Sequence, residues 1–352
     1  MERATARLVA LARSGEVPLG LAGPEAGELV AAAKRQGLAG LLDEALGGDA
    51  SWPGNARESL REAHREDLAR TLRLLALGRR AQQALAAAGL RSLALKGAAV
   101  TDTALVPAGL RPMGDVDLLV LDDWQAARAV LERHGFVALH RADHAWSFRD
   151  ADGGGLVELH WSPTSCPGFH PVPVEAAWEA SVPGPWLRAP GPEDLFCLLG
   201  LHAAFQHALR LTLAQWLDFR RLLESRAARP ETLAAAAGRW RAGAALSLSL
   251  DVARAVVAAP VEPALLARLE PRPSRFVRSL AAAAARDPAR ALVAGDPAPR
   301  EIAALRFALA RGRRRELLAR TLRPALPGLP RVSAWRRAGA LLRRWGGAAL
   351  RP

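Results

Sequence analysis

The sequence is poor in several residue types that often carry chemistry. Its 352 residues include no tyrosine and two cysteines, and among its 48 basic residues only Lys34 and Lys96 are lysines. Cys166 and Cys197 give neither a disulfide framework nor a zinc-binding spacing, and they fit a reducing compartment. The abundance of alanine, leucine, glycine and proline, with arginine in place of lysine, is typical of a GC-rich bacterial genome.

Long apolar runs are also missing, although half of the residues are hydrophobic. The nearest candidate for a membrane span, residues 242–259, is interrupted by Asp251 and Arg254. Arginines break the short apolar stretch at the N-terminus, which argues against a signal peptide. We therefore expect a cytoplasmic protein without a transmembrane segment, whose length allows one large domain or two to three smaller ones.

The net charge of +13 is concentrated at one end of the chain. Residues 306–352 hold thirteen arginines and one acid, Glu316, which accounts for +12 and leaves the rest nearly neutral. Trp335, Leu342 and Trp345 fall at helical spacing beside arginines. This tail could lie on a membrane surface or bind nucleic acid, but we expect a helix that packs its tryptophans on the body of the protein.

The chain changes character twice. Residues 1–88 combine apolar residues at helical spacing with an alanine-rich composition, which predicts an N-terminal helical region. Residues 89–188 alternate short strand and helix patterns, residues 189–305 return to helices, and residues 306–352 form the basic tail, which we expect to be helical. The predicted fold class is α+β, with a compact core between two helical regions.

Within the predicted core, several segments have strand patterns. They are residues 91–97, 115–121, 136–140, 144–150 and 156–161. The glycine-rich turn ADGGG between the last two predicts a hairpin. Helices are expected after the first two strands, and Asp122 or Asp123 is placed to cap the second helix.

The stretch RPMGDVDLLVL, residues 111–121, begins a buried strand with two carboxylates. Side chains alternate faces along a strand, so Asp115 and Asp117 point the same way, while Val116 and Leu118 point into the packing. Two acids on one buried face repel each other and lose solvation unless a cation lies between them. Mg²⁺ prefers such oxygen ligands together with substrate phosphates, so we expect a site for Mg²⁺ or Mn²⁺ here.

A third carboxylate is expected from a neighbouring strand. Glu158 interrupts the apolar strand LVELHW, and His160 shares its face. A solvated strand edge would explain Asp115 alone. The set of three acids favours a pair of metal ions that clamps an in-line phosphoryl displacement.

The segment LALKGAAV, one strand earlier, indicates phosphate binding. A strand that ends in glycine and opens a helix presents free backbone N–H groups, which favour phosphate. Lys96 beside Gly97 adds a point charge for phosphate oxygens. Arg111 could contact phosphate too, although a solvated loop arginine is an equal alternative, and Gly97 could be only a turn residue.

Other polar residues have simpler interpretations. His202 and His207 are five residues apart on an expected helix, so they should not share a face as paired zinc ligands do, and we expect core or interface histidines. Asp218 is expected to pair with Arg221 one helical turn away. His144 opens a strand near Glu158 and could reach the site.

The combined pattern resembles the DNA polymerase beta-type nucleotidyltransferase superfamily, in which a strand–glycine–helix unit precedes a D-x-D strand and a later strand supplies another acid. The segments LALKGAAV, RPMGDVDLLV, VELHW and LHAAFQHALRLTLAQWLDFRRLL are similar to a bacterial family of uncharacterised nucleotidyltransferases, over roughly residues 70–260. The superfamily usually has serine after the glycine, where this chain has Ala98. The resemblance implies a small mixed-sheet nucleotidyltransferase core.

The resemblance also implies an activity. A nucleoside monophosphate would pass from an NTP to an acceptor hydroxyl, with release of pyrophosphate. Asp115 and Asp117 would hold the metals, and Glu158 would complete the second metal site and help to deprotonate the acceptor. Lys96 and Gly97 would touch the triphosphate.

Three other functions remain open at this point. In a toxin-like nucleotidyltransferase acting on RNA, the basic tail would bind the RNA. A catalytically silent binding protein could share the fold, although the complete set of acids argues against it. A D-x-D glycosyltransferase would leave Lys96, Gly97 and Glu158 without a role.

Overall fold

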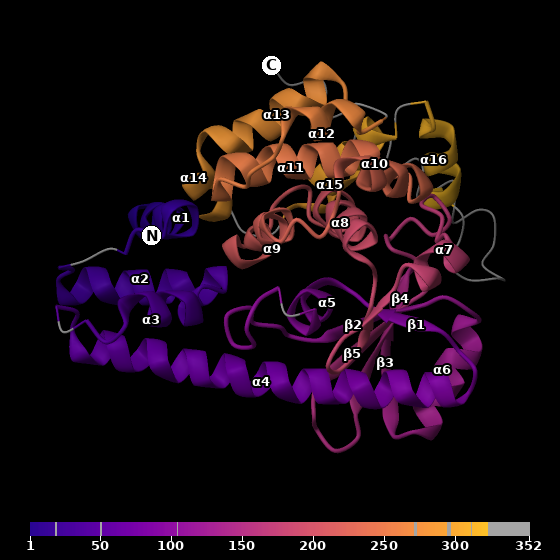
Figure 1. Ribbon diagram of the computed structural model, residues 1–352, viewed down its shortest axis with the longest axis horizontal. Coiled ribbons are helices and arrows are strands. Elements are labelled where there is room, and N and C mark those ends of the chain that lie inside the picture. Colours follow the sequence, from indigo (N-terminus) through magenta and orange to yellow (C-terminus); the bar gives the residue numbers. More distant parts are fainter. Residues whose placement is uncertain are drawn as a thin grey trace.

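The structure is a computed structural model. It describes residues 1–322 apart from residues 18–19, 50, 104, 271–272, 294–296 and 311. The helix predicted around residues 333–350 lies outside the described residues. Figure 1 shows a sheet enclosed between one long helix and a group of C-terminal helices.

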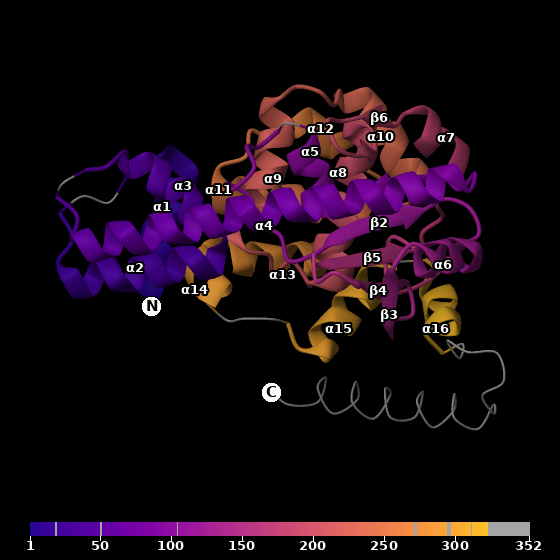
Figure 2. The same cartoon turned by 90° about the horizontal axis from the view of Figure 1, so that it is seen from below.

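Helices make up the N-terminal part, as its composition predicts. They are α1 (Glu2–Ser14), α2 (Gly23–Gln36), α3 (Ala39–Leu46) and α4 (Gly54–Ala87). With 34 residues, α4 is about 50 Å long, and it runs along most of the molecule (Figures 1 and 2). It ends where Gly89 adopts a φ of 74° and the Leu90 N–H donates to the Leu85 carbonyl.

The core is a mixed sheet with the strand order β1-β2-β5-β4-β3. Its strands are β1 (Ser92–Ala94), β2 (Val116–Val120), β3 (Phe136–Arg141), β4 (Ala145–Asp150) and β5 (Leu156–His160). β2 pairs antiparallel with β1 and parallel with β5, and β5, β4 and β3 form antiparallel pairs. The predicted strands and the β4–β5 hairpin are therefore confirmed. The first strand is shorter than expected, because helix α5 (Lys96–Asp102) already begins at Lys96.

The two faces of the sheet have different coverings. α4 packs against β1, β2 and β5, and α6 (Trp124–Arg133) packs beside it. Asp123, one of the two predicted caps, accepts the Gln125 N–H at the start of α6. Gly78 brings α4 so close to β2 that a Cβ there would lie 2.8 Å from a methyl of Val116. Val116 therefore faces α4, and Asp117 faces the C-terminal helices.

The C-terminal part contains a small two-stranded sheet and a further set of helices. These elements are α7 (Val174–Glu179), β6 (Val182–Pro183), β7 (Arg188–Ala189), α8 (Pro192–Leu201), η1 (His202–Gln206), α9 (Leu213–Glu224), α10 (Pro230–Arg239), α11 (Gly243–Val257), α12 (Pro263–Arg268), α13 (Arg275–Arg286), α14 (Pro288–Val293), α15 (Pro299–Leu309) and α16 (Arg314–Leu322). The fold class is α+β, as predicted, with helices on both sides of the sheet.

One predicted helix differs in form. The apolar pattern of residues 192–209 predicts one helix, but α8 passes at His202 into the π-helical segment η1. Shortly after η1, Ala208 and Leu209 have positive φ angles of 47° and 64°. Wide helical turns and backbone strain of this kind concentrate at functional sites, and this segment lies over the sheet face that carries Asp117.

Candidate active site

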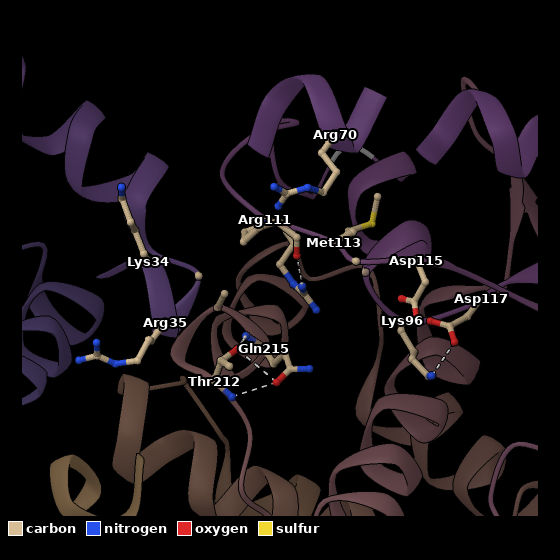
Figure 3. Close-up of a pocket in the computed structure, with 15 residues that line it drawn as sticks. Lys34, Arg35, Arg70, Lys96, Arg111, Met113, Asp115, Asp117, Thr212 and Gln215 are labelled. Atoms are coloured by element: carbon tan, nitrogen blue, oxygen red, sulfur yellow. Dashed lines mark hydrogen bonds and ion pairs between the residues drawn. The ribbon is translucent and has the colours of Figure 1, made fainter. Parts of the chain in front are cut away.

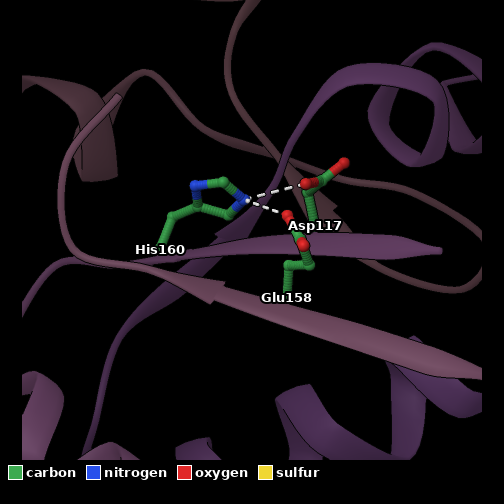
Figure 4. A group of neighbouring side chains, drawn as sticks. All are labelled: Asp117, Glu158 and His160. Atoms are coloured by element: carbon green, nitrogen blue, oxygen red, sulfur yellow. Dashed lines mark hydrogen bonds and ion pairs between the residues drawn. The ribbon is translucent and has the colours of Figure 1, made fainter. Parts of the chain in front are cut away.

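The predicted acids meet where β2 and β5 lie side by side. Asp115 directly precedes β2, Asp117 is the second residue of the strand, and the parallel register sets Asp117 opposite Glu158. Because alternate residues of β5 share a face, His160 joins Glu158 on the same side. Figure 4 shows the side chains of Asp117, Glu158 and His160 converging.

Asp117 is engaged by two cationic side chains. Its Oδ1 accepts hydrogen bonds from the Lys96 Nζ at 2.6 Å and from the His160 Nε2 at 2.8 Å. Burial alone would raise the pKa of Asp117, but Lys96 and His160 hold it below its ordinary value. In the structure, Lys96 and His160 compensate the charge of this acid.

The pKa values of His160 and Glu158 both shift in the direction that favours the charged form. Burial opposes charge on the His160 imidazole, but its hydrogen bonds to Asp117 and Glu158 raise its pKa. The Glu158 Oε2 lies 3.4 Å from the His160 Nε2, and this contact lowers the pKa of Glu158. The other carboxylate oxygen of Glu158 accepts the Ser147 hydroxyl at 3.0 Å.

Asp115 is the acid without such support. Burial and the neighbouring Asp117 charge raise its pKa to about 6. When two carboxylates share a buried site, ionising both has a high free-energy cost unless a cation lies beside them. Among the three acids, Asp115 is therefore the one whose charge the surrounding side chains compensate least.

A cavity of about 360 Å³ opens beside these acids. Its walls come from α2, α4, the segment before β2, and the start of α9. Its charged and polar lining residues include Lys34, Arg35, Arg70, Lys96, Arg111, Asp115, Asp117, Thr212 and Gln215. Figure 3 shows the acids and Lys96 at one side, Arg70 and Arg111 between, and Lys34 and Arg35 at the far side with their side chains directed away from the acids. Such an excess of cations suits a polyanionic ligand.

Lys96 and Gly97 lie at the cavity wall, beside the acids. Lys96 has a φ of 50°, a left-handed conformation that is uncommon for a residue with a side chain. Gly97 packs so tightly that a Cβ would lie 3.1 Å from Met113 and 3.4 Å from the Arg111 guanidinium. The turn between β1 and α5 is therefore held in a strained, closely packed form beside the acids.

Arg111 has a structural partner that the sequence did not indicate. Its Nε donates to both carboxylate oxygens of Asp218, at 2.9 and 3.1 Å, and its Nη1 donates to the Pro112 carbonyl. Arg221, the expected partner, also forms an ion pair with Asp218, at the longer distance of 3.9 Å. Arg111 thus lines the cavity as part of a buried ion pair that joins the segment before β2 to α9, and not as a solvated loop residue.

The histidines of η1 contact each other, against the expectation from their spacing. The rings of His202 and His207 lie 4.4 Å apart, because a π-helical turn brings residues five apart onto one face. His202 also pairs with Gln206, whose Nε2 donates to the His144 Nε2 at 2.8 Å. η1 is therefore tied to the start of β4, next to the acids. The two histidines are buried or partly buried, as expected for core or interface residues.

The residues fit a divalent cation. Asp117, Glu158 and His160 each bring one ligand atom to within 4.8 Å of the other two, and Asp115 adds a carboxylate at the same edge. The contributions of α2, α4 and α9 to the cavity were not predicted from the sequence. Two signals were present: both lysines of the chain line the cavity, and the TLAQ sequence forms a capping box at Thr212 and Gln215.

Comparison with known families matches residues 23–258 to a family described as uncharacterised nucleotidyltransferase. The match covers more than half of the chain and includes α2 to α11, with all the residues of the site. No curated protein and no solved structure matches the chain. In the described part of the chain, every helix is too short or too polar to cross a membrane.

Proposed function

The chain belongs to the family of uncharacterised nucleotidyltransferases, and we propose that it transfers a nucleoside monophosphate from an NTP to an acceptor hydroxyl, releasing pyrophosphate. The observation that carries this proposal is the pairing of Asp117 with Glu158 across β2 and β5, beside a cavity rich in cationic side chains. Nucleotidyl transfer needs both features, because it depends on positioning phosphates and compensating their charge.

We assign the divalent ion, Mg²⁺ or Mn²⁺, to Asp115, Asp117 and Glu158. Bound ions would neutralise charge on the phosphates and orient them for in-line displacement. The raised pKa of Asp115 supports this assignment, because a bound cation would relieve the repulsion between Asp115 and Asp117.

We assign the triphosphate-binding site to this cavity. Lys96 supplies a point charge at the end nearest the acids, and the missing Cβ of Gly97 makes room for Met113 and Arg111 at the cavity wall. Arg70 of α4 adds a further charge, and its side chain is half exposed. Arg111 contributes its charge from the cavity wall while its Nε holds Asp218.

The proposed reaction has one bond-forming and one bond-breaking event. The acceptor oxygen attacks the α-phosphorus of the NTP, and the bond from that phosphorus to the bridging oxygen of pyrophosphate breaks. The acceptor proton passes to Glu158, a carboxylate that its contact with His160 keeps ionised. Pyrophosphate then leaves with the negative charge.

Incubation with α-labelled NTPs tests this proposal. Each NTP is mixed with the protein, Mg²⁺ or Mn²⁺, and pools of nucleic acids, proteins, sugars and small hydroxyl compounds. We expect label on one acceptor class, a mass increase of one nucleoside monophosphate residue, and stoichiometric pyrophosphate. Absence of label from every pool, together with no metal-dependent NTP binding, would contradict the proposal.

Two carboxylate variants locate the activity. Asp117→Asn should abolish transfer, but it also leaves Lys96 and His160 buried without their anion, so its stability must be measured. Glu158→Gln is the gentler test, because Glu158 is 30% exposed. Asp123→Asn is the matched control, since asparagine caps α6 as aspartate does. Full transfer by Glu158→Gln would exclude the assigned role.

A further inference from the structure

We propose that His160 is itself a ligand of the metal ion, and that the site therefore prefers Mn²⁺ to Mg²⁺. The inference rests on the proposed function for the need of a divalent ion, and it changes the expected donor set from carboxylates alone to two carboxylates and an imidazole. It is carried by the geometry of Asp117, Glu158 and His160.

The donor atoms already have the spacing of metal ligands. The His160 Nε2 lies 2.8 Å from the Asp117 Oδ1 and 3.4 Å from the Glu158 Oε2. Neighbouring ligands around a six-coordinate ion with bonds of about 2.1 Å are about 3 Å apart. The three atoms can therefore occupy adjoining positions around one ion with small adjustments of their side chains, once the His160 Nε2 has released to solvent the proton that it donates to Asp117.

The backbone fixes this arrangement. Asp117 pairs with Glu158 across the parallel strands, and His160 follows two residues later on the same face of β5. His160 is 1% exposed, so its ring has little freedom to turn away. Metal sites built on strands of this kind need little reorganisation when the ion binds.

The surroundings also support ligation. The Ser147 hydroxyl holds the Glu158 Oε1 at 3.0 Å, which leaves the Oε2 directed at His160 and Asp117. Lys96 shares the Asp117 Oδ1 with His160. A bound dication would repel this amine, and the cavity that Lys96 lines gives it a place to move, toward the proposed triphosphate.

The donor set determines the preferred ion. Mg²⁺ keeps oxygen ligands and is usually held by carboxylates, water and phosphates. Imidazole best suits ions such as Fe²⁺, Ni²⁺ and Zn²⁺. Mn²⁺ shares with Mg²⁺ the preference for oxygen ligands, but as a transition ion it accepts a nitrogen more readily than Mg²⁺ does. A buried nitrogen in place of an oxygen therefore disfavours Mg²⁺ more than Mn²⁺.

Electron paramagnetic resonance tests ligation directly in the full-length protein without NTP. We expect Mn²⁺ to bind and its pulsed spectrum to show coupling to an imidazole nitrogen. By calorimetry, Mn²⁺ should bind at least tenfold more tightly than Mg²⁺. His160→Gln should remove the nitrogen coupling and weaken Mn²⁺ binding at least tenfold, the lower end of the loss seen when even an outer partner of a metal ligand is removed.

His144→Gln is the matched control. Its ring lies 5.3 Å from that of His160, but its Nδ1 bonds Asp143 and its Nε2 bonds Gln206, so both nitrogens are in use. This variant should keep the nitrogen coupling and the Mn²⁺ affinity. Loss of coupling in His144→Gln with retention in His160→Gln would overturn the assignment.

The remaining outcomes separate this inference from the proposed function. Bound Mn²⁺ without nitrogen coupling in the wild-type protein, Mg²⁺ binding as tight as Mn²⁺, or no binding of either ion would each overturn the inference. If label transfer from NTP still proceeds in that case, the proposed function stands and His160 is only a counter-ion of Asp117. Nitrogen coupling without transfer and without metal-dependent NTP binding would support the metal site and contradict the function.

Discussion

Asp117 depends on side chains from two other elements. Lys96 reaches it from the start of α5 and His160 from the end of β5. Removing the anion of such a buried cluster leaves uncompensated cations, which typically costs about 3–5 kcal/mol. The same carboxylate therefore serves both the stability of the fold and the proposed chemistry. Activity measurements on its variants require a stability measurement beside them.

His170 provides a test of pH dependence away from the acids. It is buried against Phe169 and Phe205, its Nδ1 donates to the Trp240 carbonyl, and Arg313 and Arg241 lie near it. Burial, aided by these arginines, lowers its pKa from 6.5 to about 3. Between these values the unfolded chain binds a proton that the native protein does not, so stability present above pH 6.5 is lost as the pH falls toward 3.

We predict that His170→Asn reduces this loss. Two pH units below 6.5 correspond to about 2.7 kcal/mol, so the difference in unfolding free energy between pH 7 and pH 4.5 should shrink by about 2–3 kcal/mol in urea titrations. Asparagine keeps a donor for the Trp240 carbonyl. The exposed His134→Asn serves as control, and equal pH profiles for His170→Asn and the wild type would contradict the assignment.

At the scale of the elements, the contact between α4 and β2 positions the acids. Gly78 lies against Val116, the residue between Asp115 and Asp117. A side chain at residue 78 must push α4 away from the strand or tilt the strand beneath it. The helix therefore influences the site without touching a substrate.

We predict that Gly78→Leu lowers the unfolding free energy by about 1–3 kcal/mol, the usual cost of overpacking, and reduces NTP-dependent transfer. The measurements are denaturant titration and initial rates. Gly27→Leu on α2, where a Cβ meets nothing within 4 Å, should change both by little. Val116→Ala added to Gly78→Leu should restore part of the stability, and no restoration would indicate a different origin of the loss.

At the scale of the whole molecule, a buried ion pair joins distant segments. Arg111 precedes β2, and Asp218 lies on α9, 107 residues later. Asp218 is fully buried and Arg111 is 7% exposed. The pair fixes one wall of the cavity against the C-terminal helices.

We predict that Asp218→Asn destabilises the protein by about 3–5 kcal/mol, because Arg111 then stays buried without its anion. The double variant Arg111→Met/Asp218→Leu should be less destabilised than either single variant, and a double-mutant cycle by urea titration measures the coupling. Asp251→Asn is the control, since its pair with Arg254 is partly exposed and should be worth less than about 1 kcal/mol. Additive effects of Arg111→Met and Asp218→Leu would argue against a coupled pair.

The role of the basic tail remains a prediction. If its tryptophans pack on the body, removal of residues 331–352 should lower the melting temperature and leave affinity for RNA unchanged. If the tail grips RNA instead, truncation should remove a binding that weakens steeply with salt, because neutralised phosphates release counterions. Thermal melts and RNA titrations at two salt concentrations distinguish the outcomes.

The sequence by itself determined the elements and the residues with unusual chemistry. Helical periodicity, strand alternation and the turn ADGGG are local signals, and they located the strands and the hairpin. Asp115, Asp117 and Glu158 stood out because acids in apolar strands are costly. Alternation of side chains was enough to place Asp115 with Asp117 and Glu158 with His160.

Only the tertiary structure decided which of these residues meet. The parallel register of β2 and β5 sets Asp117 opposite Glu158, and it depends on the packing of helices far away in the chain. The pairing of Arg111 with Asp218 and the contact between His202 and His207 were missed for the same physical reason. An ion pair across 107 residues and a π-helical turn are fixed by long-range packing, which overrides the spacing visible in a local stretch of sequence.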